Sequence, residues 1–467
     1  MRNGNGLRLG AVVAVLGVVA AACGSSGGSS STTVAGSTAA PSTAAASTPA
    51  STPASTPAST GSSTASTTGS TTEANKASAT GITADTITIG AAFPLTGPAS
   101  SSFGPDTQKG MQARFDMENA NGGVFGRKLM LVTADDGGGP QAALTAAKLL
   151  ETKNIFAELS WSPFMFGAYR EYQAKGIPVV GGSFDGPEWG DPTNRNMFTF
   201  LGSDPHYPAA TTFAQFMKDK GATKLAGIGY GDSPSSSANV KNTLAAFKSL
   251  GGTVALENTT IPFGSTDMTA AALQVKQSGA DGLYVPMVLN SDIAAVKTAR
   301  QAGAPLKSIL LSGVGYDQNT LKDPATVQDL QGVSMTTSYR PIEVNNQATQ
   351  DYVAAIKKYG NYEGIPSFGF AGGWFSADLL IYALKNAGSN NPTAKSFIDD
   401  FHSKVKGYDG NGILPDKIDF STDWGKGSLG VSATNCGFVV TLQGSKFVPE
   451  NNGEALCGKT VPGSEVK

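Results

Sequence analysis

The sequence has few of the residues on which most metal and catalytic centres depend. Its 467 residues include three cysteines and two histidines, too few for a zinc site or a larger metal centre. Charged residues make up 15% of the chain and the net charge is −2, whereas nucleic-acid-binding proteins normally carry a basic excess. These scarcities argue against a metalloenzyme and a nucleic-acid binder.

The first 22 residues have the layout of an export signal. Arg2 and Arg8 precede an apolar run at 9–22, which is shorter than the ~20 residues that span a bilayer. Small residues then lead into Cys23, an order that resembles the lipobox of bacterial lipoproteins, in which the cysteine is diacylated and becomes the new N-terminus. We predict a signal peptide at 1–22 and a lipid anchor at Cys23, because two acyl chains anchor stably where one does not. An ordinary cleaved signal with an incidental cysteine is the alternative.

The segment that follows is almost entirely Ser, Thr, Ala, Gly and Pro. Apart from Val34 it has no large apolar side chain, and its only charges are Glu73 and Lys76. Such a composition cannot offset the entropy of ordering. We predict that residues 23–80 consist of the acylated cysteine and a disordered tether.

The two remaining cysteines lie near the C-terminus. Because an exported protein folds in an oxidising compartment, we predict a disulfide between Cys436 and Cys457. Two buried free thiols are the alternative.

From residue 86 onward, strand-like and helix-like segments alternate in two series. The first series runs from a strand at 86–93 to a strand at 197–201 and includes helices at 105–121 and 140–151. The second runs from a helix at 207–220 to a strand at 308–311 and includes a strand at 224–230. This alternation predicts an α/β fold with two doubly wound parallel-sheet lobes. Ligands of such sheets bind beyond the carboxyl ends of the strands.

The loops after these strands are rich in serine, glycine and aromatic residues. They contain no P-loop, nucleophile elbow, HExxH or CxxC motif, and neither His206 nor His402 falls in one of them. A Ser–His–Asp triad therefore has no evident assembly. We predict a binding cleft without catalysis and without a cofactor or a metal.

Five short motifs, in order, carry a resemblance to a known family. They are PLTGP (94–98), ENANGGVFGRK (118–128), DD (135–136), GIPVV (176–180) and GADGLY (279–284). In residue identity and order these motifs resemble those of the type I periplasmic binding proteins of the leucine/isoleucine/valine-binding family. The resemblance extends over about 86–449.

The resemblance implies two lobes joined by a three-crossover hinge, with lobe I at 85–203 and 337–428 and lobe II at 204–336 and 429–467. It further implies a monomeric extracytoplasmic solute-binding lipoprotein of an ABC importer, anchored to the bacterial cell membrane through Cys23. Its partners would be a small-molecule ligand and an ABC permease. A ligand-sensing accessory of a membrane receptor and, less favoured, a secreted hydrolase are the alternatives.

The resemblance also places the ligand contacts. Hydroxyls and backbone N–H groups of two lobe I loops would hold a carboxylate, and an aromatic residue after the first strand would pack on the ligand. In lobe II a serine stands where the family usually has an aromatic residue, and Ser312 stands where it has the acid that holds an α-ammonium. The ligand class therefore stays open between an amino-acid-like compound, an amide or polyol, and an aromatic or other small carboxylate. The predicted contacts are Phe103, Ser160, Trp161, Ser162, Ser183, Phe184, Asp185, Ser235, Met287, Ser312 and Phe370.

Overall fold

The computed structural model describes residues 73–465. The predicted signal peptide, Cys23 and residues 24–72 of the predicted tether lie outside these residues. Within 73–465, none of the helices combines the length and apolar character needed to cross a membrane. The same residues contain no group of His, Cys, Asp and Glu side chains arranged to hold a metal ion.

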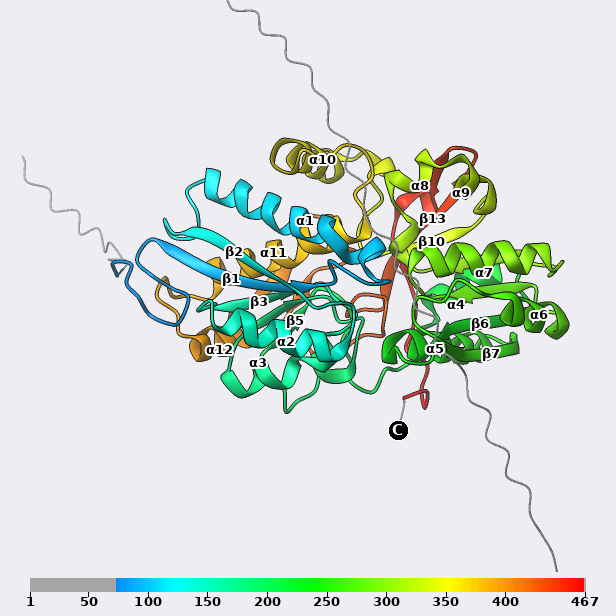
Figure 1. Cartoon of the computed structure of the whole chain (residues 1–467), viewed down its shortest axis with the longest axis horizontal. Helices are drawn as coiled ribbons and strands as arrows, with labels where there is room; N and C mark the ends of the chain where they lie inside the picture. Colours follow the sequence, from blue (N-terminus) through cyan, green and yellow to red (C-terminus); the bar gives the residue numbers. More distant parts are fainter. Residues whose placement is uncertain (1–72, 466–467) are drawn as a thin grey trace, which may run out of the picture. The chain divides into compact units, whose positions relative to one another are not determined.

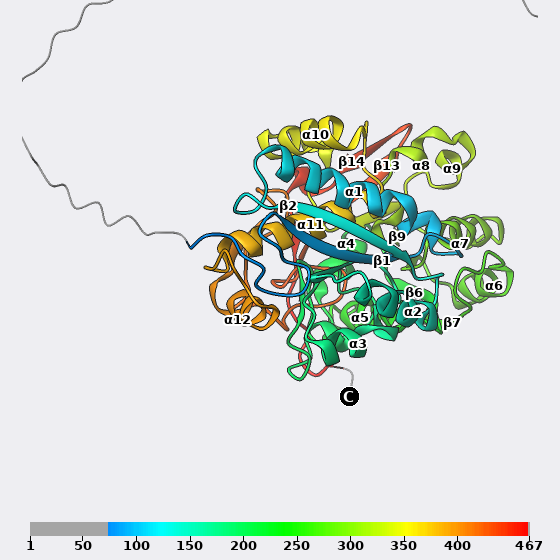
Figure 2. The ribbon, with the colours of Figure 1, turned by 60° about the vertical axis from the view of Figure 1, so that its left-hand side comes forward.

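The first sheet is parallel throughout and forms the centre of lobe I (Figure 1). Within the described residues its strand order is β2-β1-β3-β4-β5. Helices α1 and α11 lie on one side of the sheet and α2 and α3 on the other, in both views (Figures 1 and 2). Strands covered on both faces must be apolar on both faces, and β1 is buried along most of its length. The elements are β1 (Thr86–Phe93), α1 (Ser100–Ala120), β2 (Lys128–Asp135), α2 (Pro140–Glu151), β3 (Ala157–Ser160), α3 (Tyr169–Lys175), β4 (Val179–Gly181), β5 (Met197–Thr199) and α11 (Phe368–Asn386).

The second sheet forms the centre of lobe II and is parallel except at one edge. Its order in the described residues is β14-β13-β10-β9-β8-β6-β7, with β13 and β14 antiparallel to their neighbours. The strands are β6 (Lys224–Tyr230), β7 (Thr253–Ile261), β8 (Gly282–Val285), β9 (Ser308–Leu311), β10 (Ser334–Thr337), β13 (Cys436–Gln443) and β14 (Lys446–Pro449). The helices are α4 (Thr211–Asp219), α5 (Pro234–Ser249), α6 (Thr269–Ser278), α7 (Leu289–Gln301), α8 (Gln318–Lys322) and α9 (Pro324–Asp329).

The chain passes between the two sheets three times. It leaves the first sheet after β5, returns after β10 to form the helices that pack beside α1, and enters the second sheet again at β13. The predicted boundary at 336/337 falls inside β10. The returning segment contains α10 (Gln347–Gly360), α12 (Ala394–Lys404) and the hairpin of β11 (Lys406–Tyr408) and β12 (Ile418–Asp419).

Helix α1 begins five residues earlier than the sequence predicted (105–121). Its first turn ends at Gly104, whose dihedral angles (φ −34°, ψ −136°) are not helical. Proline disfavours helical geometry in the residue before it, so the break precedes Pro105. The extra turn carries Ser102 and Phe103 to the carboxyl end of the sheet.

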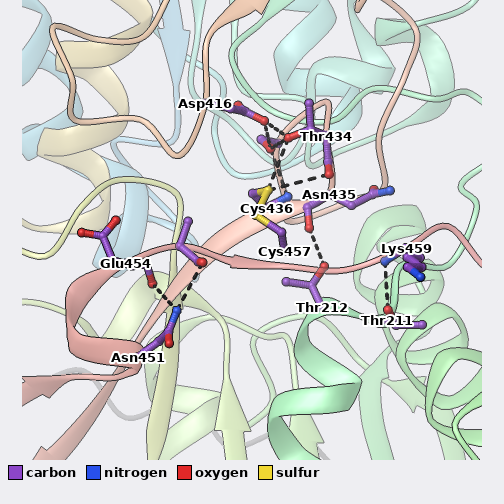
Figure 3. The surroundings of a disulfide bond; sticks show 12 residues. Thr211, Thr212, Asp416, Thr434, Asn435, Cys436, Asn451, Glu454, Cys457 and Lys459 are labelled. Carbon is purple, nitrogen blue, oxygen red and sulfur yellow. Dashed lines mark hydrogen bonds between the residues drawn. A yellow bond between two sulfur atoms is a disulfide. The ribbon is translucent and has the colours of Figure 1, made fainter.

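The predicted disulfide is confirmed. Cys436 in β13 and Cys457 in β15 (Leu456–Cys457) stand opposite each other in an antiparallel pair and are bonded. Figure 3 shows the bond beside the start of α4, where Thr212 donates to the carbonyl of Asn435 (2.6 Å) and Lys459 N–H donates to Thr211 Oγ1 (2.9 Å). The disulfide therefore fixes the C-terminal segment to the edge of lobe II.

We expect the double variant Cys436→Ala/Cys457→Ala to lose about 3 kcal/mol of unfolding free energy. The bond has a sequence separation of 21, and a closed loop of this size restricts the unfolded chain by roughly that amount. Urea unfolding of the two proteins measures the difference. Dithiothreitol should destabilise the parent protein and leave the variant unchanged; an equal response of both would contradict the assignment.

Residues 73–80 differ from the prediction of a disordered tether, because they are bound to lobe I. Buried Arg127 reaches this segment and its neighbours through four hydrogen bonds, to the carbonyls of Lys76, Thr83 and Asn390 and to Asn391 Oδ1. Asn391 in turn donates to the carbonyl of Ala74 and accepts from the N–H of Lys76. The polar composition of the segment does not indicate these contacts, since the partners lie 50 to 317 residues away in the sequence.

Candidate functional site

Two adjoining pockets lie between the lobes, at the carboxyl ends of the strands. The pockets share Phe184 and Phe368 of lobe I and Asn239, Pro286 and Ser312 of lobe II. The first pocket continues toward Phe103, Tyr230 and Phe263, and the second toward Trp161, Tyr284 and Tyr339. Both lobes therefore form the walls of one cleft, at the position expected for this type of sheet.

The lobe I wall of the cleft is a cluster of four aromatic rings. Ring centroids lie 4.8 Å apart for Trp161 and Phe184, 5.0 Å for Trp161 and Phe368, and 5.4 Å for Phe103 and Phe184. Tilted and edge-on pairs at these distances are the favourable arrangements for aromatic rings. The indole also stacks on Phe200 at 5.7 Å and lies directly on the α-carbon of Gly372 in α11.

Six of the residues predicted as ligand contacts line the cleft. Three come from lobe I and three from lobe II, so the cleft brings together side chains that are far apart in sequence. They are Phe103, Trp161, Phe184, Ser235, Met287 and Ser312.

Three of the predicted serines do not line either pocket. Ser162 donates to Asp136 and accepts from the N–H of Phe164, and Ser183 donates to the carbonyl of Gly202 (2.6 Å). Ser160 is buried, and its hydroxyl has no hydrogen-bond partner among the described residues. In this structure the hydroxyls of Ser162 and Ser183 hold the lobe I loops together.

Asp185 was predicted as a cleft residue, but its carboxylate is engaged inside lobe I. One oxygen accepts from the indole N–H of Trp189 (2.7 Å) and the other from the backbone N–H of Phe166 (2.9 Å). Burial, together with the nearby carboxyl of Glu188, raises the pKa of Asp185 well above its usual range, and burial raises that of Glu188 to about 7. The sequence placed Asp185 in the correct loop but could not show which way it points.

Phe370 is the other aromatic residue that the structure moves out of the cleft. It is buried against Tyr362, with ring centroids 4.4 Å apart. Helix α11 begins at Phe368, because Ser367 caps it by accepting from the N–H of Phe370 (3.2 Å). Phe368 therefore takes the place in the cleft that was predicted for Phe370.

Several residues that line the cleft are not among the contacts predicted from the sequence. Tyr230 ends β6, Phe263 follows β7, and Asn239 lies one turn into α5. Tyr230 at the end of β6 and Val288 after β8 lie at the carboxyl ends of strands, where the sequence predicts ligand contacts, whereas nothing local in the sequence marks Asn239 or Phe263. The additional lining residues include Tyr230, Asn239, Phe263, Val288, Val314 and Phe368.

A buried carboxylate lies behind the lobe II wall. Asp292 accepts from the N–H of Met287 (3.1 Å), and its other oxygen lies 3.5 Å from the hydroxyl of Ser312. Burial raises the pKa of Asp292 well above its usual range. Tyr230 contacts the same loop, since its hydroxyl donates to Ser291 (2.7 Å) and accepts from the N–H of Val288 (3.3 Å).

The lobes touch each other at the mouth of the cleft. The N–H of Leu289 at the start of α7 donates to Ser102 in the first turn of α1 (3.3 Å). Phe164 of lobe I meets Phe263 of lobe II with ring centroids 5.3 Å apart.

His402 binds the carbonyl of Arg195 and His206 contacts Asp204, so in the described residues neither histidine forms a nucleophile–base pair in the cleft.

Two α/β lobes that enclose a cleft and are joined by three crossing segments define a two-lobed solute-binding protein. The family model described as periplasmic binding protein matches residues 86–446, and the chain belongs to this family, which is one of binding proteins and not of enzymes. The resemblance to type I members is thereby confirmed, and the protein is an extracytoplasmic binding protein.

The similar proteins are distant in sequence. The chain is 24% identical over 379 residues to Leu/Ile/Val-binding protein homolog 7 of Brucella abortus (strain 2308), covering 76% of this chain and 86% of the relative. A fatty acid ABC transporter substrate-binding protein from Thermomonospora curvata has a TM-score of 0.67 at 19% identity, covering 85% of this chain and 97% of that one. A solute-binding protein of an ABC transporter from R. palustris in complex with benzoate has a TM-score of 0.64 at 15% identity, covering 80% and 99%.

Proposed function

We propose that this protein captures a small solute in the cleft between its lobes and delivers it to the permease of an ABC importer. The observation that carries the proposal is a cleft whose walls come from both lobes, at the carboxyl ends of both sheets. A solute bound there would contact both walls and would favour the closed arrangement of the lobes. The similar proteins, whose names refer to Leu/Ile/Val, fatty acid and benzoate, support a role in solute capture.

We further propose that Cys23 carries the lipid that holds the protein at the bacterial cell membrane. The basic start, the apolar run and the small residues before Cys23 support this assignment. A monomer tethered in this way would present its closed lobes to the permease.

The proposal is tested by mass spectrometry of small molecules released when protein purified from its native host is denatured. We expect one compound in near-stoichiometric amount, and its readdition to stripped protein should raise the melting temperature. Phe184→Ala, which removes a ring shared by both pockets, should weaken binding by at least about tenfold, as expected for an aromatic anchor at the centre of an interface. Leu149→Ala on the exposed face of α2 is the control and should bind normally. If no compound is released and no metabolite shifts the melting temperature, the protein is not a solute receptor.

A further inference from the structure

The walls of the cleft carry no charge. Among residues 73–465, every side chain that lines either pocket is aromatic, aliphatic, a thioether, a hydroxyl or an amide, apart from glycine and proline. The aromatic members come from both lobes. Phe103, Phe184 and Phe368 line the first pocket with Tyr230 and Phe263, and Trp161 lines the second with Tyr284. A charged group on a ligand would lose its water here and would need a compensating partner that these side chains do not supply.

Backbone N–H groups are the usual substitute for a cationic side chain in binding an anion, but six of those in and next to the cleft walls are already occupied, three of them in residues that line a pocket. Side-chain oxygens from the same loops, or from the opposite lobe, accept their hydrogen bonds. An anionic ligand would have to displace these acceptors, some of which are themselves carboxylates. The pairs are Phe164 with Ser162, Phe166 with Asp185, Ser236 with Ser233, Met287 with Asp292, Val288 with Tyr230 and Leu289 with Ser102.

A cationic ligand would find no carboxylate in the cleft walls to pair with. Three buried carboxylates lie around the cleft, at Asp136, Asp185 and Asp292, and none of them lines a pocket. Each is turned toward donors of its own loop and of a neighbouring loop: Asp136 toward Gly138 and Ser162, Asp185 toward Trp189 and Phe166, and Asp292 toward Met287 and Ser312. A buried ammonium without an anionic partner in contact is unfavourable.

The polar side chains that line the cleft are neutral. Ser235, Asn239 and Ser312 place two hydroxyls and an amide at or near the junction of the two pockets. Asn239 donates to the carbonyl of Ser235 (3.1 Å) and Ser312 to that of Met287 (3.1 Å), and the side-chain oxygens of both can still accept from a ligand. On the lobe I side the indole N–H of Trp161 is buried and has no acceptor among the described residues. These groups suit a hydroxyl, an ester or a carboxamide, which forms hydrogen bonds without a net charge.

We propose that the cleft takes an uncharged, mostly apolar solute that carries a neutral hydrogen-bonding group such as a hydroxyl or a carboxamide. This inference rests on the proposed function and restricts it, since it excludes zwitterionic amino acids and simple carboxylates as the main ligand. The apolar part of the solute lies against the aromatic wall, and its polar group lies near Asn239 and Ser312.

The test uses compounds that share one skeleton and differ in charge. Calorimetry at pH 7 compares 3-phenylpropanamide and 3-phenyl-1-propanol with 3-phenylpropanoate, 3-phenylpropylamine and L-phenylalanine, and a second series replaces the phenyl group with an isobutyl group. We expect the neutral members to bind at least about tenfold more tightly than the charged members of the same skeleton, since burying an uncompensated charge is costly. A charged member that binds as well as its neutral counterpart would overturn the inference.

A charge introduced into the wall gives a second readout. In Asn239→Lys the propanoate should gain at least about tenfold relative to the propanamide, because a cation now faces the pocket junction. Asn239→Gln, which stays neutral, is the matched control and should keep the neutral preference. If Asn239→Lys produces no shift toward the propanoate, the side chain at 239 does not face the ligand and the inference is wrong.

The same samples separate this inference from the proposed function. If no member of either series binds, the compound released from native protein decides: a neutral apolar compound supports the inference, and a charged one overturns it while the role in solute capture stands. If no compound is released and nothing binds, the proposed function fails as well.

Discussion

Gly372→Ala is expected to disrupt the cleft and to lower the unfolding free energy by about 3–5 kcal/mol. A Cβ atom at this position would lie 1.8 Å from Cε2 of Trp161, well inside van der Waals contact. The indole cannot yield, because it is buried and packed against Phe184, Phe200 and Phe368. Expelling it forfeits packing comparable to that lost when a buried tryptophan is truncated. Chemical denaturation measures the loss, and ligand titration should show affinity reduced with it.

Two further variants identify the cause of the Gly372→Ala effect. Gly139→Ala adds the same methyl group at a glycine with open space around it and an extended backbone (φ −164°). Because Gly139 is the N-cap of α2, the unfolding free energy should fall by no more than about 1 kcal/mol. The double variant Trp161→Ala/Gly372→Ala should be more stable than the sum of the single changes predicts, because the methyl group then enters the space that the indole leaves. If the two effects simply add, the collision between Trp161 and position 372 is not what destabilises the single variant.

The alternation of strands and helices made the fold predictable from the sequence. Strands at 86–93, 224–230 and 308–311 and the helix at 140–151 have the observed bounds, because each is a buried run or an amphipathic run closed by a turn or a proline. Local signals were insufficient where a tertiary contact decides the boundary. Residues 73–80 have the composition of the tether, and only their contacts with Arg127 and Asn391, which are distant in the sequence, fix them to lobe I.

The candidate site was predictable at the level of loops more than of side chains. The carboxyl ends of the strands placed Trp161, Phe184 and Ser312 in the cleft. Neighbouring serines and acids in the same loops turned inward, because buried N–H groups and carbonyls in those loops need partners, as Ser162 and Asp185 show. Which side chain satisfies the loop and which faces the solute depends on backbone geometry that a residue pattern does not contain.

The second large effect is a dependence of stability on pH, and it arises from Glu158, whose carboxyl group is buried at the centre of the first sheet. One of its oxygens accepts from the N–H of Ala92 (2.8 Å), and the other has no hydrogen-bond partner among the described residues. Burial raises the pKa of Glu158 to about 8, from a usual value of 4.5. The folded protein therefore holds this proton over a range of pH in which the unfolded chain has released it.

We expect Glu158→Gln to become stabilising relative to the parent protein as the pH rises. An acid whose pKa is raised by folding contributes its full stability below about pH 4.5 and loses it progressively up to about pH 8. One pKa unit corresponds to about 1.4 kcal/mol, so the loss in the parent protein amounts to several kcal/mol. Glutamine keeps an oxygen for the N–H of Ala92 and has no proton to lose. Urea unfolding from pH 5 to pH 9 should give similar unfolding free energies at pH 5 and an increasingly higher value for the variant above pH 6. The control Glu257→Gln, at an exposed position, should follow the parent protein. Parallel curves for Glu158→Gln and the parent protein would mean that Glu158 ionises as readily in the folded chain as in the unfolded one.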